Sequence, residues 1–240
     1  IISFFFFFGL GLILSRQQSQ RADQVLSNNG LSSTYYVFNP KKKHNIKQFL
    51  TYVNKNFSHD KVQIHFESDY IPDRVLIWAN YNLKSQPLAK GSSRYFSKND
   101  FDGTIPFAVI SSDTKDRVVT LQNNHYLKEN NDYVTIIGEL KKNNESQNGQ
   151  AVYYLSTGIN QPTAKESITN YKVVVDGLNK NEANALQHYL RGSMQIKDFS
   201  KTYNRQHGIS PTKKLIGAIF CVVIALIVAE IAAVTAENPV

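Results

Sequence analysis

The chain has 240 residues, a formal net charge of +8 and a single cysteine, Cys221. One cysteine excludes a disulfide within the chain and a thiolate metal cluster, and the six histidines show neither a pair at helical spacing nor the carboxylate spacing of zinc sites. The lysines and arginines are scattered along the sequence, which argues against nucleic acid as a partner and favours attraction to anionic lipid or an anionic cell envelope.

Two apolar runs lie at opposite ends of the chain. Residues 1–15 carry no charge, and residues 215–236 carry one, Glu230. As a helix with about 1.5 Å per residue, the second run extends about 33 Å, enough to cross a hydrocarbon core of about 30 Å. The first run is short and begins without Met, so we interpret it as the clipped end of a longer helix. A signal peptide is the alternative, but polar residues 16–18 follow where a small-residue cleavage site is expected.

These runs predict how the chain is organised. We expect a transmembrane helix at 1–15, a juxtamembrane stalk at 16–33, a core domain at 34–199, a second stalk at 200–214, a transmembrane helix at 215–236 and a tail at 237–240. A domain held at both ends receives any relative movement of the two helices as a mechanical input. A simple tethered enzyme needs only one anchor.

The core domain is expected to begin with a strand followed by an amphipathic helix. Residues 34–38 are aromatic and β-branched, as is typical of a strand. Asn39 and Pro40 predict the N-cap and first position of a helix, which places the lysines at 41–43 in its first turn. One helix face would be apolar, formed by Ile46, Phe49, Leu50, Val53 and Phe57.

The middle of the domain predicts strands separated by polar segments. Residues 62–67 alternate between apolar and polar, which indicates a half-buried strand, and residues 75–79 indicate another. Residues 85–102 read as a loop with short structure. Residues 106–110 predict a buried strand, after which Ser111 or Ser112 caps a short helix that reaches Val119.

The last third predicts a hairpin and then a repeat of the opening pattern. Residues 133–137, closed by Gly138, pair with residues 152–155 across a polar tip at 141–149. The closing unit comprises a strand at 172–176, a helix capped by Asn179 and Glu182 that ends at Gly192, and a strand at 195–199. The expected fold class is therefore α+β, built from a βαβ unit near each end like two halves of a sandwich.

One segment carries a resemblance to a known family. Residues 88–100, Leu-Ala-Lys-Gly-Ser-Ser-Arg-Tyr-Phe-Ser-Lys-Asn-Asp, are similar to a Gly-Arg, Phe and acidic pattern in the extracytoplasmic core domain of MacB/FtsX-like ABC transporter permeases. The matching residues are Gly91, Arg94, Tyr95, Phe96 and Asp100, with two serines inserted after the glycine. Residues 107–111 and 134–138 resemble strands that this family places next, and the order of parts resembles the first half of such a permease.

This resemblance implies both a fold and a function. The fold is an extracytoplasmic α+β domain with a porter-like part and a second subdomain, flanked by two transmembrane helices. The function is that of a permease subunit in a mechanotransmission-type exporter of a peptide, antibiotic or lipid-like substrate. The implied partners are an ABC-type ATPase, a second permease copy, membrane lipid and an extracytoplasmic adaptor or peptide, and no cofactor is implied.

The sequence departs from that family in three respects. Members normally carry four membrane helices, and this sequence contains two apolar runs. Nothing in it matches the cytoplasmic coupling segment between the second and third helices. It also lacks the G-x-x-x-x-G-K-[ST] motif that cradles nucleotide phosphates, so we expect the ATPase on a separate chain or domain. We therefore expect a fragment or a shortened relative of a permease.

Charges near the apolar runs give conflicting indications of topology. Arg16, Arg21 and the lysines at 213–214 flank the runs on the domain side, which by the positive-inside rule would place the domain in the cytoplasm. The family architecture places it outside a cell membrane that the chain crosses more than once, and we expect that orientation. Glu230, about fifteen residues into its run, is either a functional or helix-pairing carboxylate or a side chain that reaches the interface.

Two other classes of function stay open. A cell-surface binding or sensor module held by two helices, without transport activity, would have the same sequence features and no dependence on an ATPase. A membrane-bound enzyme is disfavoured, because no G-x-S-x-G elbow or comparable motif frames a nucleophile.

Overall fold

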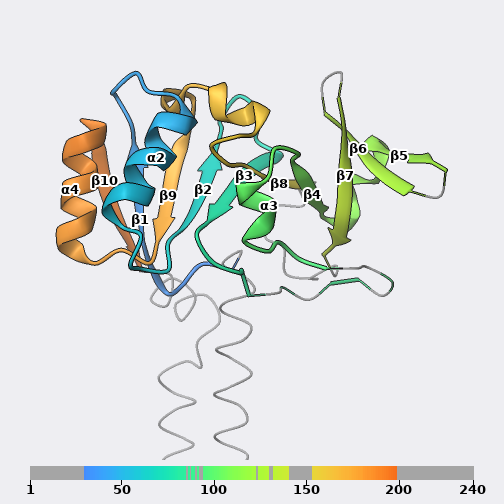
Figure 1. Cartoon of the computed structure of the whole chain (residues 1–240), viewed down its shortest axis with the longest axis horizontal. Helices are drawn as coiled ribbons and strands as arrows, with labels where there is room; N and C mark the ends of the chain where they lie inside the picture. Colours follow the sequence, from blue (N-terminus) through green and yellow to red (C-terminus); the bar gives the residue numbers. More distant parts are fainter. Residues whose placement is uncertain are drawn as a thin grey trace, which may run out of the picture. The chain divides into compact units, whose positions relative to one another are not determined.

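A computed structural model describes residues 30–198, except 85, 87, 90, 92, 93, 123, 130, 131 and 141–152. Its strands form one ten-stranded sheet in the order β10-β1-β9-β2-β3-β8-β4-β7-β6-β5 (Figure 1). The strands are β1 (Thr34–Asn39), β2 (Gln63–Glu67), β3 (Arg74–Ala79), β4 (Phe107–Ile110), β5 (Val118–Leu121), β6 (Asn124–Glu129), β7 (Asp132–Glu139), β8 (Tyr153–Ser156), β9 (Lys172–Asp176) and β10 (Ser193–Asp198). The helices are α2 (Ile46–Asn56), α3 (Asn99–Asp102) and α4 (Lys180–Leu190), with short 3₁₀ helices η1 (Ser112–Arg117), η2 (Pro162–Lys165) and η3 (Ile168–Asn170).

The two βαβ units, β1-α2-β2 and β9-α4-β10, interleave in one half of this sheet. β9 pairs antiparallel with both β1 and β2, and β1 pairs antiparallel with both β9 and β10. Each unit therefore holds a strand of the other unit between its own two strands, which is the split βαβ arrangement of ferredoxin-like folds. The prediction of α+β structure from βαβ units is confirmed. Their separation into two halves of a sandwich is wrong, because the strands mix in a single sheet.

The closing unit matches its prediction closely. Asn179 accepts hydrogen bonds from the backbone N–H groups of Asn181 and Glu182, and the Glu182 carboxylate accepts from the Asn179 N–H at 2.8 Å, which completes the capping box. Helix α4 ends at Leu190, one residue before Arg191 adopts a left-handed conformation with φ of 50°. β9 has its predicted bounds, whereas β10 begins at Ser193, two residues before the predicted start, because α4 ends at Leu190 rather than at Gly192.

Helix α2 begins later than predicted. Its N-cap is Asn45 rather than Asn39, and the Asn45 and Gln48 side chains accept each other's backbone N–H groups at 2.8 and 3.1 Å. The first two lysines of the 41–43 run donate their backbone N–H groups to the carbonyl of Leu190, so this run forms a loop at the end of α4 instead of a helical turn. The apolar face of the helix is confirmed; its buried residues are Ile46, Phe49, Leu50 and Val53.

Strand β2 is buried on both faces, whereas the alternating pattern predicted a half-buried strand. Ile64 and Phe66 face α2, and Gln63 and His65 on the other face are 3% and 1% exposed. The Tyr81 hydroxyl donates to Gln63 Oε1 at 3.3 Å, and the Gln63 amide nitrogen lies 2.7 Å from His65 Nε2, which suits a neutral imidazole that accepts there. Burial lowers the pKa of His65 to about 4.

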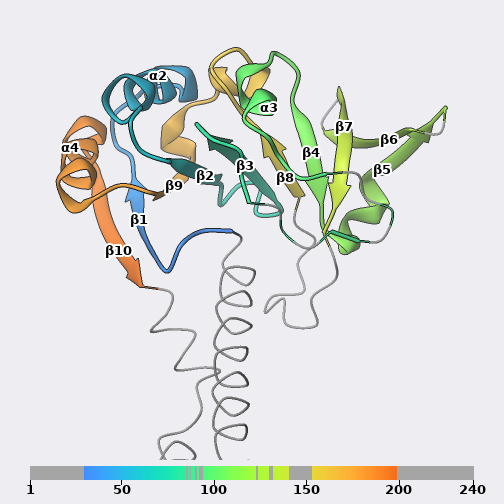
Figure 2. The same ribbon diagram turned by 60° about the horizontal axis from the view of Figure 1, so that its bottom comes forward.

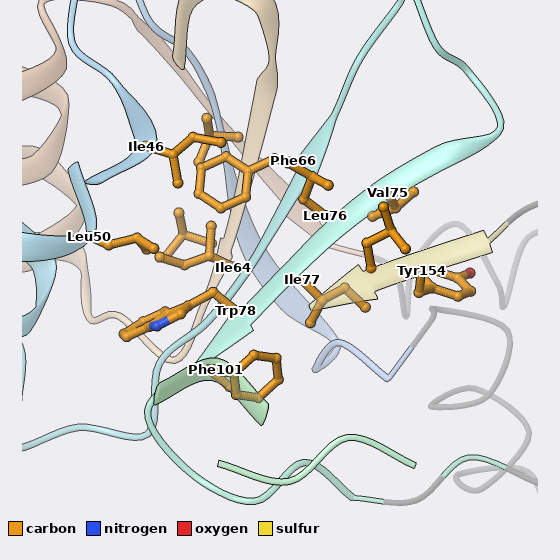
Figure 3. Close-up of a cluster of buried hydrophobic side chains, with 14 of the residues drawn as sticks. Ile46, Leu50, Ile64, Phe66, Val75, Leu76, Ile77, Trp78, Phe101 and Tyr154 are labelled. Carbon is orange, nitrogen blue, oxygen red and sulfur yellow. The ribbon is translucent and has the colours of Figure 1, made fainter. Parts of the chain in front are cut away.

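The neighbouring strand β3 shows how both faces of the sheet are covered. Leu76 and Trp78 lie on the side of Leu50 from α2, while Val75 and Ile77 point to the opposite face (Figure 3). Figure 2 shows α2 and α4 side by side on one face of the ferredoxin-like half. Because all six residues of β3 are buried, this strand forms the middle of the hydrophobic core.

Six strands inserted between β2 and β9 extend the same sheet. β8 pairs parallel with β3 and antiparallel with β4, and β4 separates it from β7. The predicted hairpin between residues 133–137 and 152–155 is therefore wrong, although both strands exist. A short buried apolar run fits any central position of a sheet, and its pattern does not select its neighbours. The hairpin tip predicted at 141–149 lies outside the described residues.

The sheet ends in a hairpin that the sequence did not predict. The predicted helix stops at Arg117, and β5 and β6 follow, joined by a turn in which Gln122 has a φ of 48°. Most residues of these two strands are exposed or half-buried. The strands therefore lack the apolar alternation by which a strand is recognised.

Within the described residues, no helix is long and apolar enough to span a membrane. The apolar runs at 1–15 and 215–236, most of the first predicted stalk and all of the second lie outside this part of the chain, and so does Glu230.

Candidate functional site

Residues 88–100, the family-like segment, contain a loop from Arg94 to Asp100 that is closed by an ion pair between these two residues. We call this ion-paired loop the clasp. Arg94 donates from both terminal nitrogens to Asp100, at 2.5 Å to Oδ2 and 2.8 Å to Oδ1. The Ser97 backbone N–H and hydroxyl also donate to Asp100 Oδ2, at 2.8 and 2.9 Å. Burial raises the pKa of Asp100, but these hydrogen bonds from Arg94 and Ser97 outweigh it and lower the pKa below its ordinary value. Asp100 is therefore held as a carboxylate that closes the loop from 94 to 100.

The clasp also fastens this loop to β7. The Arg94 backbone N–H donates to the Ile137 carbonyl at 3.1 Å. A Cβ atom on Gly138 would lie 2.4 Å from the Arg94 carbonyl oxygen, so only glycine lets the loop pass this close to the strand. Gly138 therefore lies inside β7 and leaves room for the Arg94 backbone, rather than ending the strand as predicted. The Arg94 guanidinium also lies 5.5 Å from the centroid of the Phe107 ring.

Four of the five family-like residues come together, and Gly91 stands apart. Tyr95 and Phe96 are 6% and 2% exposed; their rings pack at 5.1 Å, and the Gln86 amide donates to the Tyr95 hydroxyl at 3.2 Å. Gly91 has a φ of 91°, and a Cβ atom there would meet nothing within 4 Å. The environment of Arg94, Tyr95, Phe96 and Asp100 is that of a structural fastening.

A second cluster, centred on Arg74, has no counterpart in the sequence analysis. The Arg74 side chain is 5% exposed, and its terminal nitrogens contact Glu129 at 3.1 Å, Glu166 at 2.8 Å and the Tyr171 hydroxyl at 2.6 Å. The Tyr171 hydroxyl also donates to Glu166. Glu129 comes from β6, Glu166 follows η2, and Arg74 begins β3, so one guanidinium ties three separate parts of the fold.

A cleft of about 390 Å³ opens beside this cluster. The Tyr153 hydroxyl donates to Glu129 at 2.5 Å and accepts from Arg117 at 3.2 Å, while Arg117 pairs with Asp73 at 2.5 Å. Burial, followed by the hydrogen bond to Glu129, raises the pKa of Tyr153, which therefore stays protonated. The lining residues are Ile71, Asp116, Arg117, Lys128, Glu129 and Tyr153.

The chemistry of this cleft is that of balanced charge. It brings together two acidic and two basic side chains, and Glu129 and Arg117 already have partners. In the part of the chain that the structure describes, no group of three or more His, Cys, Asp or Glu side chains could hold a metal ion. Arg74 and Tyr153 meet because β3 and β8 pair in parallel with these residues opposite each other, and no sequence pattern specifies that pairing.

Comparisons with known proteins give little further information. No protein family and no curated protein sequence matches the chain. One similar solved structure is the extracellular domain of the noncanonic ABC-type transporter YknZ from Gram-positive bacteria, with 16% identity, coverage of 74% of this chain and 96% of that chain, and a TM-score of 0.36. That protein is an ABC-type transporter, and the sequence resemblance is also to an ABC transporter family, but this TM-score is too low to show a shared fold. The functional proposal therefore rests on the strand pairing of this domain and on the sequence resemblance of residues 88–100, 107–111 and 134–138.

Proposed function

We propose that this chain is a permease subunit of an ABC exporter whose described domain lies outside the cell membrane between two membrane helices. The observation that carries the proposal is the pairing of the domain's first and last strands. β1 and β10 are antiparallel neighbours, with Thr34 opposite Asp198 at one end and Asn39 opposite Ser193 at the other. β1 therefore begins and β10 ends at one residue pair, about 5 Å apart. Before β1, residues 31 and 32 still contact the sheet, because Leu31 is buried against Val37 and Val174 and the Ser32 backbone N–H donates to Asp176 at 2.7 Å.

This pairing determines how the domain responds to movement at its ends. If the two connections move together, the domain moves as one body. If they separate, the force first acts on the contacts that hold residues 31 and 32 on the sheet. Once these break, it reaches the Thr34 end of the β1–β10 ladder, whose hydrogen bonds each contribute about 1 kcal/mol net. Such a domain transmits joint movement and yields to separation, which suits a subunit that couples motion of membrane helices to an outer partner.

The remaining parts of the proposal rest on the family resemblance. A partner ATPase would supply the motion, a second permease copy would complete the membrane unit, and the outer domain would engage an adaptor or a peptide, antibiotic or lipid-like substrate. Transport by mechanotransmission follows from the same reasoning. The alternative is a binding or sensor module anchored by two helices. The pairing of β1 with β10 is equally compatible with that function, because a movement of the domain on ligand binding would be transmitted to both helices.

Co-purification distinguishes the two functions. The tagged, full-length parent protein would be recovered from its native membranes in mild detergent, and the accompanying proteins identified by mass spectrometry. A stoichiometric ATPase with a P-loop is expected for the exporter. Recovery of the tagged protein without any such ATPase would refute the exporter and support the binding module.

A further inference from the structure

Helices α2 and α4 lie side by side on one face of the sheet (Figures 1 and 2), and basic residues gather in the sequence where the end of α4 meets the segment before α2. Lys41 and Lys42 bond through their backbones to the last carbonyl of α4, which brings the lysine run beside Arg191. Lys47 lies in the first turn of α2. We define the basic–aromatic patch by its cations Lys41, Lys42, Lys43, Lys47 and Arg191 and its rings His44, Tyr52 and Tyr189.

The rings of this patch stack on one another. Tyr52 and Tyr189 lie nearly parallel with centroids 3.6 Å apart, and His44 stacks on Tyr189 at 5.3 Å. The Lys42 ammonium lies 4.4 Å from the centroid of the Tyr189 ring. Because both faces of Tyr189 are used inside the patch, it offers no open ring face for a sugar. The patch therefore presents ammonium groups to solvent, and one of them, on Lys42, is held over a stacked ring.

The positive charge of the patch is not compensated nearby. Among the described residues, no carboxylate lies within ion-pair distance of its five cations. Glu166 lies at the start of α2, where its backbone carbonyl accepts a hydrogen bond from the Ile46 N–H. Its carboxylate, however, pairs with Arg74 and not with a cation of the patch. The positive end of the α2 dipole and the negative end of the α4 dipole both lie here and offset each other, so the field of the patch comes from its side chains. The chemistry that fits this field is a run of carboxylates or phosphates.

The location of the patch favours a partner other than the chain's own membrane. Lys41 and Arg191 adjoin the Asn39–Ser193 end of the β1–β10 pair, whereas β1 begins and β10 ends at the Thr34–Asp198 end. The two ends are about 17 Å apart, at about 3.4 Å per residue. This direction of approach rests on the proposed function, whereas the charge argument does not.

We propose that the basic–aromatic patch binds an acidic segment of a partner polypeptide. A peptide is favoured over a phosphate polymer because the half-buried Tyr52 and Tyr189 border the lysines, and tyrosine is enriched where proteins contact proteins. Since the faces of Tyr189 are stacked, it would contact a peptide through its ring edge, and the lysines would bind the carboxylates.

The test is a binding measurement on the full chain in a nonionic detergent. The probe is a fluorescent deca-glutamate peptide, followed by anisotropy at about 0.1 M salt, where the Debye length is about 10 Å. The patch variant is Lys41→Glu/Lys43→Glu/Lys47→Glu. The control variant, Lys84→Glu/Lys98→Glu/Lys180→Glu, changes three exposed lysines outside the contact between Tyr52 and Tyr189, one of them on α4. Both triple variants have a formal net charge of +2 instead of +8.

We expect the patch variant to bind the peptide about tenfold more weakly than the unchanged chain, and the control variant to bind within about twofold of it. Equal weakening in both variants would mean that overall charge attracts the peptide, and would overturn the proposal. Inorganic polyphosphate of matched charge is the second probe. If it binds about tenfold more tightly than the peptide and is lost in the patch variant, the patch is a phosphate-polymer surface and the peptide proposal is overturned. None of these outcomes depends on an ATPase partner.

Discussion

The buried histidine of β2 should make the domain unstable in mild acid. His65 has a pKa of about 4 in the folded chain against an ordinary value of 6.5, because burial disfavours its charged form. Well above pH 6.5 His65 is neutral in both states and its contribution is fully present. As the pH falls from 6.5 toward 4, the unfolded chain binds a proton that the folded chain excludes, so the free energy of unfolding decreases. One pH unit corresponds to about 1.4 kcal/mol, which gives a loss of about 2 kcal/mol by about pH 5.

The hydrogen bonds around His65 make proton uptake in place unfavourable. The Gln63 amide nitrogen already faces His65 Nε2, and a protonated ring would present an N–H to that amide. Turning the Gln63 amide would remove the bond from the Tyr81 hydroxyl to its oxygen. The folded state therefore resists protonation until the local structure opens.

The measurement is urea unfolding of the full chain in nonionic detergent at about pH 7 and about pH 5. Trp78 is the chain's only tryptophan, is 3% exposed and lies opposite Ile64 of β2, so its fluorescence reports this region. Between about pH 7 and about pH 5, the free energy of unfolding of the unchanged chain should fall by about 2 kcal/mol more than that of His65→Gln. The control is His59→Gln, in which an exposed histidine is changed, and its free energy of unfolding should fall by as much as that of the unchanged chain. Equal losses in His65→Gln and the unchanged chain would refute the reasoning, because groups common to both cancel in the difference.

Three further predictions concern the attachment of the loop at residues 94–100 to β7, the Arg74 cluster, and the pairing of β1 with β10. Gly138→Ala should lower the free energy of unfolding by about 2 kcal/mol or more through the clash with the Arg94 carbonyl, whereas Gly91→Ala, with open space but a φ of 91°, should lower it by about 1 kcal/mol; equal effects in urea unfolding would contradict this. Glu129→Gln should destabilise the domain by about 3 kcal/mol because it removes a carboxylate from buried Arg74, and Glu67→Gln, which removes the exposed partner of Lys172, by less than about 0.5 kcal/mol. Thr34→Cys/Asp198→Cys, made with Cys221→Ser, should oxidise readily to an internal disulfide that changes gel mobility, while Thr34→Cys/Ser193→Cys should not; crosslinking of the second pair would show that β1 and β10 are not in this register.

Local structure was predictable from the sequence wherever a pattern and a chemical signal agreed. The Asn179–Glu182 capping box and the apolar face of α2 are such cases, because caps and helical periodicity depend on residues within a few positions of each other. The start of α2 was predicted six residues too early, at Asn39 instead of Asn45. Asn39-Pro40 resembles a helix start, but Asn45 with Gln48 forms the reciprocal pair, and the intervening lysines are held by α4.

Strand partners were not predictable, and the candidate cluster depends on them. The insertion of β4 between β7 and β8 and of β9 between β1 and β2 arises from packing of the whole sheet, which no local pattern records. Arg74 is followed by an apolar run and Tyr153 begins another, so both resemble ordinary strand ends in the sequence. Their meeting with Glu129 requires three strand positions to be known together.

The position of β1 in the sheet has a consequence for how the chain acquires its structure. β1 lies between β9 and β10, and β9 begins at Lys172, 133 residues after β1 ends at Asn39. During synthesis the first strand is therefore complete long before either of its neighbours exists, and closing so long a loop slows folding. Until then the aromatic run at 35–38 has two open edges, which is the condition under which strands of different chains associate. A chain interrupted before residue 172 would keep both edges open, and one interrupted between β9 and β10 would keep one, so early termination should yield aggregates rather than a smaller domain.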